Sequence, residues 1–253
     1  MSQIVTVHSY RGGTGKSSTA ANLALLLASA GRRVALVDTD IHTPALHVLF
    51  PGAPAHRSLT DYLIGRCEIE DAAAPADTGQ GHDGFFLVPA RTRTGAGNEL
   101  MGRGYDVGLL REGFDRLIDT LALDVLLLDT HAGFNNETVT AMAGADSLIV
   151  LTRADRLDLA GAQETVSLAR RLGCGRLSLA VNMVPDGTLP DRLRTDLETA
   201  YDAPLTAVLP YAPQMAALAG ERLLTTAYPH HPLVAGYRRI IGAISRGTTG
   251  LRR

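Results

Sequence analysis

Short apolar runs alternate along the chain with longer segments in which apolar residues recur every three or four positions. Two of the runs, those starting at Val125 and Leu148, are almost continuously apolar. Such runs are typical of parallel strands that are covered by helices on both faces. The predicted strands are Ile4–His8, Val34–Asp38, Phe85–Val88, Val125–Asp129, Leu148–Leu151, Leu177–Val181 and Leu205–Leu209.

The segments between these runs carry the signals of helices, and several of them end at a glycine. Alternation of strand and helix predicts an α/β fold, a doubly wound, mostly parallel seven-stranded sheet with helices on both faces. The length of 253 residues is consistent with a single domain, 1–253. The expected helices are Lys16–Ala30, Asp106–Leu121, Asn135–Ala143, Leu157–Leu172, Pro190–Tyr201 and Leu233–Ser245.

Two stretches interrupt this alternation. Residues 71–84 are rich in Ala, Gly and Asp, and residues 91–104 are rich in Gly and Arg, so we expect both to be surface connections. The second stretch follows the carboxyl end of a strand, which leaves open a role as a binding loop. The last helix contains Gly236 and Gly242 and has a modest apolar face. We therefore expect it to pack on the sheet rather than to lie on a membrane.

The segment 10–17, YRGGTGKS, joins the first predicted strand to the first predicted helix. Its glycines allow unusual backbone conformations, and its N–H groups together with the helix N-terminus form a cradle for phosphate. Lys16, the only lysine of the chain, is expected to reach the β- and γ-phosphates, and the Ser17 hydroxyl to ligate Mg²⁺. The pattern predicts a P-loop made of Gly12, Gly13, Thr14, Gly15, Lys16, Ser17 and Ser18.

Acidic residues end two of the predicted strands. The second strand ends at Asp38, and Asp40 follows two positions later. One carboxylate in this place can help to bind Mg²⁺, and the other can orient or deprotonate an attacking water. The strand that ends at Asp129 has the four preceding hydrophobic residues of a Walker B strand, whose carboxylate holds Mg²⁺ through water.

Taken together, these motifs resemble the MinD/ParA family of deviant Walker ATPases. The resemblance covers most of the chain in the family's order, on RGGTGKSS, DTDIHTPALH, LLLDTHAGF, LIVLTRADRLDL, LAVNMVP and AVLPYAPQM. It implies that Asp38 lies near Mg²⁺ with Ser17 and Asp129, and that Asp40 orients or deprotonates the water. It also implies contacts to adenine from Asn182 and a base-lining segment that includes Pro210 and Tyr211.

One position departs from the family pattern. The residue before the double glycine is a lysine in the family, where it touches the partner's phosphates across a nucleotide-sandwich dimer, but here it is Arg11. Arginine keeps the charge and can fork to two phosphate oxygens, although its planar head and longer reach differ from an ammonium. We expect Arg11 to retain this catalytic role beside Lys16 and Asp40. A slow or monomeric ATPase is the alternative.

His131 follows the predicted Walker B strand, where many relatives have proline or serine. Because a histidine beside a charged site commonly serves as a hydrogen-bonding group, we expect His131 to support the site rather than to ligate a metal. The other histidines show no metal-ligand spacing.

The resemblance implies a Mg²⁺-dependent ATPase switch, slow and stimulated by a partner, that dimerises around ATP and positions or partitions a cellular cargo. The segment VNMVP lacks the N-K-x-D of guanine-specific sites, so ATP is favoured over GTP. A nucleotide-binding regulatory module with little turnover stays open as an alternative. A metallocentre-assembly ATPase is disfavoured, because Cys67 and Cys174 form no C-x-C or C-x-x-C pair.

Composition says little about partners. The formal charge of −2 supplies no general attraction to DNA or anionic lipid, and only a local arginine group such as Arg238 and Arg239 argues for either surface. We expect a homodimer with a protein regulator or cargo adaptor. The first residues lack a secretory-signal pattern, and the longest apolar stretch, Leu23–Ala30, is shorter than the roughly 20 residues that span a bilayer. We therefore expect a cytoplasmic protein.

Overall fold

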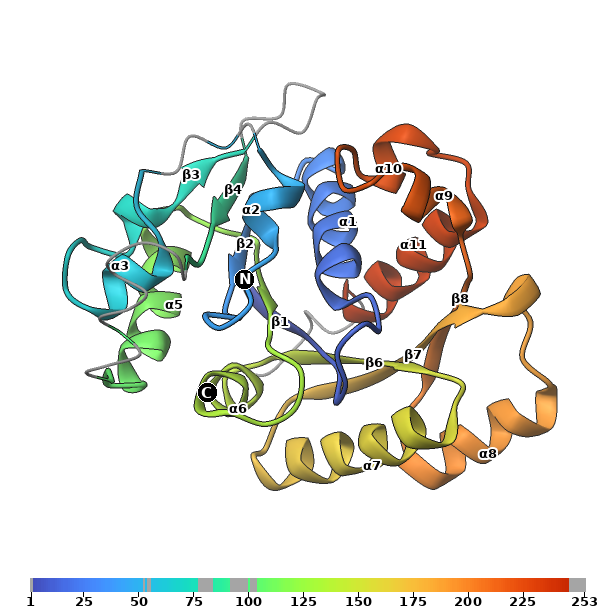
Figure 1. Ribbon diagram of the computed structural model, residues 1–253. Coiled ribbons are helices and arrows are strands. Elements are labelled where there is room, and N and C mark those ends of the chain that lie inside the picture. The colour runs from blue at the N-terminus through green and yellow to red at the C-terminus, as the bar shows by residue number, and fades with distance from the viewer. Residues whose placement is uncertain are drawn as a thin grey trace.

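One eight-stranded sheet runs through the protein (Figure 1). The computed structural model describes residues 2–51, 53, 56–76, 84–91, 100 and 104–245. The strand order is β3-β4-β2-β5-β1-β6-β7-β8, and every neighbouring pair is parallel except β3 with β4. This arrangement confirms the predicted doubly wound α/β fold. The strands are β1 (Gln3–His8), β2 (Val34–Asp38), β3 (Ala74–Pro75), β4 (Phe85–Val88), β5 (Val125–Asp129), β6 (Ser147–Arg153), β7 (Arg176–Val184) and β8 (Leu205–Pro210).

Strand β3 is the one that the sequence analysis missed. It lies at the sheet edge, antiparallel to β4, within residues 71–84, so the predicted count of seven strands and the predicted surface loop were wrong there. A strand of two residues shows no alternating pattern, and a proline within it argues against a central strand. Residues 77–83 and most of the second predicted connection, 91–104, lie outside the described residues.

Helices cover both faces of the sheet (Figure 1). Residues of α1, α2, α10 and α11 share one buried cluster with β1 and β2, and α9 borders it. The opposite face is covered by α3, α5 and α6 over the first half of the sheet and by α7 and α8 over the second. The helices are α1 (Lys16–Ser29), α2 (Leu46–Leu49), α3 (Leu59–Leu63), α5 (Gly108–Thr120), α6 (Asn136–Ala143), α7 (Arg156–Arg171), α8 (Asp191–Tyr201), α9 (Pro213–Ala217), α10 (Leu224–Ala227) and α11 (Pro232–Ser245), with 3-10 turns at η1 (Glu70–Ala72) and η2 (Pro185–Gly187).

Successive side chains of the central strands pack alternately against the helices on the two faces of the sheet. In β2, Val34 and Leu36 belong to the cluster around α1, whereas Ala35 and Val37 belong to the cluster around α5. All four are fully buried, as expected for strands covered on both faces. The polar residues that follow each strand are therefore left at the carboxyl edge of the sheet.

The last described helix, α11, packs on the sheet as predicted. Val234, Tyr237 and Ile240 are fully buried or nearly so against the α1 side of the core. Its last turn is held by Arg176 Nη1, which donates to the Ala243 carbonyl at 3.0 Å. In the part of the chain that the structure describes, no helix combines the length and apolar character needed to cross a membrane.

Candidate functional site

The segment between β1 and α1 is held by hydrogen bonds within itself and by one from β7. The Thr14 hydroxyl donates to Ser9 Oγ at 2.7 Å, and the Ser9 hydroxyl donates to the Arg11 carbonyl at 2.7 Å. From β7, Asn182 Nδ2 donates to the Thr14 carbonyl at 2.8 Å. Gly15 has a φ of 90°, and a Cβ on it would lie 2.6 Å from Asn182 Nδ2. Glycine is thus required at this position both by backbone conformation and by space.

Lys16 opens α1, at the point where the first-turn N–H groups are free of intrahelical partners. No acidic residue lies in this first turn. The Lys16 side chain is buried, and burial lowers its pKa, whereas the charges of Asp129 and Asp40 raise it. A buried ammonium at a helix N-terminus favours binding of an anion such as phosphate.

Asp129 is a buried carboxylate without a hydrogen-bond partner. It is 1% exposed, and neither of its oxygens is hydrogen-bonded within the described part of the chain. Burial raises the pKa of Asp129 to about 7. The polar side chain of Ser17 and the positive charge of Lys16 offset this increase only in part. An orphaned buried carboxylate beside a serine hydroxyl fits Mg²⁺, which takes one or two carboxylates and completes its shell with phosphate oxygens and water.

Asp38 stands next to Asp129, because the two residues are register partners in β2 and β5. Its oxygens accept backbone hydrogen bonds from Asp40 at 3.1 Å and from Ala45 and Leu46 at 3.0 Å each. Burial and then the charge of Asp129 raise the pKa of Asp38 well above its ordinary value. Asp38 therefore both holds the loop after β2 and adds a second carboxylate to the place that fits a cation.

Asp40 is held by two residues. Its Oδ1 accepts from the Thr43 N–H at 2.8 Å and lies 2.9 Å from His131 Nδ1, and its Oδ2 accepts from the Thr43 hydroxyl at 2.9 Å. Burial alone would raise the pKa of Asp40, but the hydrogen bonds from Thr43 and His131 outweigh it and lower the pKa. The prediction that His131 forms hydrogen bonds beside the site is confirmed, whereas the part played by Thr43 was not foreseen.

Arg11 lies against α7 of its own chain. Its Nη1 is 3.3 Å from Asp158 Oδ1, and Arg153 Nε lies 2.5 Å from the other oxygen of that carboxylate. The Asp158 side chain is 1% exposed, whereas that of Arg11 is 43% exposed. Asp158 was not recognised from the sequence, because 147 positions separate it from Arg11. A contact of Arg11 with a partner's phosphates stays a prediction.

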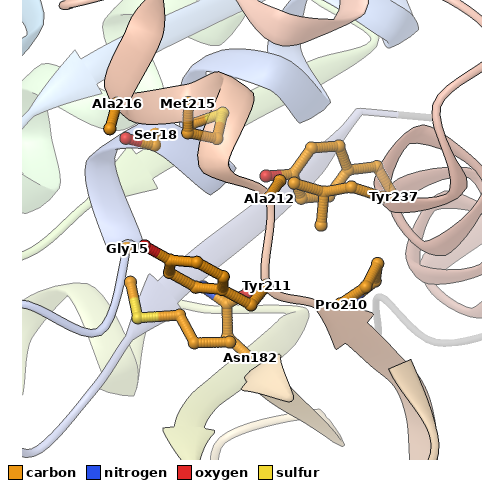
Figure 2. A pocket seen from close by; sticks show the side chains of 11 residues that line it. Gly15, Ser18, Asn182, Pro210, Tyr211, Ala212, Met215, Ala216 and Tyr237 are labelled. Carbon is orange, nitrogen blue, oxygen red and sulfur yellow. The ribbon is translucent and has the colours of Figure 1, made fainter. Parts of the chain in front are cut away.

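A cavity of about 300 Å³ opens beside the P-loop (Figure 2). It brings together Asn182, Pro210 and Tyr211, the three residues predicted to contact the base. Figure 2 shows them among the residues around the cavity, together with Tyr237, which comes from α11. The full lining is Gly15, Ser18, Asn182, Met183, Pro210, Tyr211, Ala212, Met215, Ala216, Leu233 and Tyr237. The lining from α9 and α11 was missed, because it follows from how these helices pack and not from a motif.

The predicted site residues thus gather at the carboxyl edge of the sheet, and Arg11 is the one whose side chain is engaged with a neighbouring helix instead. The P-loop supplies phosphate-binding groups, and the ends of β2 and β5 supply the carboxylates of Asp38 and Asp129 for a cation. Asp40, which follows β2, adds an acceptor oxygen. The adjoining cavity is lined mainly by apolar side chains. Chemically this set can hold a metal-bound nucleotide with its base in the cavity.

Comparison with known proteins places the chain in a family. A family model described as an AAA domain matches residues 2–173. The antiactivator FleN of Pseudomonas aeruginosa is 30% identical over 210 residues, which cover 83% of this chain and 71% of FleN. The chromosome-partitioning ATPase Soj of Thermus thermophilus is 29% identical over 233 residues, 91% of this chain and 82% of Soj. The chain belongs to the MinD/ParA family of P-loop ATPases.

A solved structure shows the same fold. The septum site-determining protein MinD of Pyrococcus horikoshii, complexed with Mg-ADP, superposes with a TM-score of 0.83 at 22% identity over 97% of each chain. This likeness confirms the predicted fold. Membership of a P-loop ATPase family, together with the buried Lys16 and the orphaned Asp129, also agrees with ATP and Mg²⁺ as the predicted ligands.

Proposed function

We propose that this MinD/ParA family member is an ATP-hydrolysing switch whose association with a second copy depends on the bound nucleotide. The observation that carries the proposal is the unpartnered, buried Asp129 carboxylate beside Lys16. In this proposal Lys16 contacts the β- and γ-phosphates, while Ser17 and Asp129 hold Mg²⁺ with Asp38 close by. A Mg²⁺ ion held there would neutralise charge on the phosphates, and Asp40 would orient or deprotonate the attacking water.

The base cavity supports ATP as the nucleotide. Asn182 donates one of its two amide N–H groups to the Thr14 carbonyl, and its Oδ1 remains a hydrogen-bond acceptor. An acceptor suits the amino group of adenine and is mismatched with the carbonyl oxygen of guanine. Tyr211 and Pro210 supply apolar surface for the ring.

The exposed apolar side chains support a dimer across the same face. Seven large apolar residues are exposed among the described residues, and five of them lie on segments at or just beyond the carboxyl ends of strands. Apolar side chains gathered around a site indicate an interaction surface, and a second copy of the chain would cover them across a symmetric interface. The five are Tyr10, Phe134, Leu157, Met183 and Tyr211.

In the dimer, Arg11 would leave Asp158 and instead contact the phosphates of the nucleotide bound to the partner. The exchange is feasible because the Arg11 side chain is 43% exposed and Asp158 retains its second arginine, Arg153. The exchange also costs an ion pair, which is consistent with slow basal hydrolysis that a regulator stimulates. We further propose that the switch acts in the cytoplasm, with a regulator or cargo adaptor, to position or partition a cargo.

A regulatory module with little turnover is the second candidate. It is favoured by the contact between Arg11 and Asp158, which engages a proposed catalytic residue within its own chain. A metallocentre-assembly role has no such support. Cys67 and Cys174 pack against different core clusters, and burial raises the pKa of each thiol to about 11, so neither is poised to bind a metal as thiolate.

Phosphate release with ATP and Mg²⁺ tests the proposal. Wild type is expected to turn over, and Asp40→Ala to lose roughly 100-fold in kcat while ATP still binds, because only the group that acts on the water is removed. Asp196→Ala, a change of an exposed aspartate on α8, is the matched control and should behave as wild type. Equal background release from wild type and Asp40→Ala would instead favour the regulatory module.

A further inference from the structure

We propose that His131 is a positioning residue that aims the Asp40 carboxylate at the attacking water, an inference that rests on the hydrolysis proposed above. The residue belongs neither to the P-loop nor to the residues that line the base cavity. Within the described part of the chain, its ring forms a hydrogen bond with one site residue, Asp40, through Nδ1 at 2.9 Å.

The sheet register explains why these two residues meet. Asp38 and Asp129 face each other as register partners in the neighbouring strands β2 and β5. Asp40 lies two positions beyond the first and His131 two positions beyond the second, so both chains leave the sheet side by side. A hydrogen bond between them therefore joins the loop after β2 to the loop after β5.

The hydrogen bonds to Asp40 leave one acceptor position open. A carboxylate offers about four lone-pair sites, two on each oxygen. Oδ1 is used by the Thr43 N–H and by His131, and Oδ2 is used once, by the Thr43 hydroxyl. The remaining site on Oδ2 is the one that a water can occupy. The bonds to Oδ1 thus determine which oxygen of Asp40 serves the water.

Thr43 cannot fix Asp40 relative to the phosphate site by itself. It is three residues away on the same loop, so its two bonds move with the loop. Within the described residues, the His131 bond is the side-chain contact that ties the Asp40 carboxylate to another strand end. A small misplacement of a catalytic group can cost a large factor in rate without affecting substrate affinity.

The geometry also assigns the tautomer of His131. An ionised carboxylate only accepts hydrogen bonds, so Nδ1 of the ring must carry the proton. The ring is further held edge-on by His42, with centroids 5.6 Å apart. The side chain required at position 131 is therefore one that presents an N–H at the δ position.

Substitutions that move this N–H test the proposal. His131→Ala is expected to lower kcat for ATP roughly 10- to 100-fold with the KM for ATP changed less than about twofold. His131→Asn places an amide N–H at the δ position and should restore most of kcat, whereas His131→Gln places it one bond further and should not. His230→Ala, at an exposed histidine after α10, is the control for the loss of an imidazole.

Three results overturn the inference. Wild-type kcat in His131→Ala, while Asp40→Ala is inactive, removes the positioning role and leaves the proposed function standing. Equal rescue by Asn and Gln, or none by either, would show that the δ-position N–H is not what matters. No turnover of wild type above Asp40→Ala would remove the proposed function and the inference with it.

A measurement on the protein without nucleotide checks the contact directly. Nitrogen NMR of labelled histidine rings, at a pH where the ring is neutral, is expected to show the proton on Nδ1 of His131 in wild type. Asp40→Ala should abolish that preference, because it removes the acceptor. A proton on Nε2 in wild type contradicts the proposal whether or not the His131 variants fold.

Discussion

At the scale of single residues, the site holds charged groups in places that are unfavourable for them without a ligand. Burial lowers the pKa of Lys16 and raises that of Asp129, so each is shifted toward its neutral form. A bound phosphate would stabilise the ammonium, and a bound cation would stabilise the carboxylate. Burial makes the charged forms of Lys16 and Asp129 unfavourable in the folded protein. Binding of phosphate and a cation would remove this unfavourable electrostatic free energy, which adds to the free energy of binding.

The first prediction concerns the ammonium. Lys16→Ala is expected to raise the Kd for ATP at least about 100-fold, which corresponds to about 2.7 kcal/mol, because it removes a buried charge from the phosphate site. Lys16→Arg keeps the charge but is expected to bind weakly too, since a planar guanidinium does not fit the space of a buried ammonium. Calorimetry measures both, and near-wild-type affinity in Lys16→Ala would overturn the assignment of the site.

The second prediction concerns His8, a fully buried residue at the end of β1. Burial and then the charge of Lys16 lower its pKa to about 3, while its Nδ1 lies 2.8 Å from the Thr130 hydroxyl. In the unfolded chain His8 has an ordinary pKa and is protonated as the pH falls through 6.5. In the folded chain it stays neutral until the pH reaches about 3. His8 therefore supports the folded state fully above pH 6.5, and this contribution is lost as the pH falls below that value.

The loss amounts to about 2 kcal/mol at pH 5 relative to pH 7.5. Chemical unfolding of His8→Asn at the two pH values should show a smaller drop than wild type by this amount, whatever the absolute stability of the variant. His230→Asn, at an exposed position, should follow the wild-type pH dependence. An unchanged drop in His8→Asn would mean that the residue is not kept neutral in the folded protein.

At the scale of elements, α7 is in close contact with the P-loop. A Cβ on Gly161, in the first half of α7, would lie 2.2 Å from Cδ1 of Tyr10. Asp158, one turn earlier, holds Arg11. The same helix therefore contacts the two consecutive residues that precede the P-loop, Tyr10 and Arg11. A shift of α7 is expected to change the position of the P-loop and hence its contacts with phosphate.

A pair of glycine substitutions provides the third prediction. In α11, a Cβ on Gly242 would have no atom within 4 Å, so Gly242→Ala should stabilise the fold by about 0.5–1 kcal/mol through helix propensity. Gly161→Ala gains the same propensity but must displace the Tyr10 ring. We expect it to weaken ATP binding by about 1 kcal/mol, or roughly fivefold.

Thermal unfolding and calorimetry on both variants provide the comparison. Combining Gly161→Ala with Tyr10→Ala should remove the coupling, because the ring that clashes is absent. If Gly161→Ala bound ATP as tightly as Gly242→Ala does, the contact between α7 and the P-loop would have no bearing on the nucleotide.

At the scale of the whole molecule, the face that carries the P-loop also carries most of the exposed apolar side chains. Leu157, at the start of α7, is 67% exposed and stands next to Asp158, the residue that holds Arg11. A single chain therefore presents an apolar surface and a half-exposed arginine around the same site. This combination suits a partner that brings both an apolar surface and a phosphate.

The fourth prediction is that a slowly hydrolysed ATP analogue converts the protein from monomer to dimer. Leu157→Glu should stay monomeric while it still binds the nucleotide, because it places a charge in the apolar interface. Tyr228→Glu is the matched control, since Tyr228 is 43% exposed but follows α10 rather than the end of a strand. Sedimentation measures the mass, and dimerisation of Leu157→Glu to the wild-type extent would exclude this face as the interface.

The sequence alone predicted the fold, and its motifs supplied the residues that the structure brings together in the candidate site. Apolar runs separated by helical patterns reveal parallel strands, because burial on both faces leaves a signal within each segment. The P-loop and the residues Asp38, Asp40 and Asp129 were found for a related reason. They end strands or come shortly after them, and the carboxyl ends of parallel strands share one edge of the sheet.

Only the tertiary structure showed which side chains from distant segments meet there. Asn182 and Thr14 are 168 positions apart, Arg11 and Asp158 are 147 apart, and His131 and Asp40 are 91 apart. Such contacts depend on strand register, helix placement and rotamers, none of which leaves a local pattern in the chain. The contact of Arg11 with Asp158 and the hydrogen bond of His131 to Asp40 are thus determined by tertiary packing, because packing decides which strand ends and helices become neighbours.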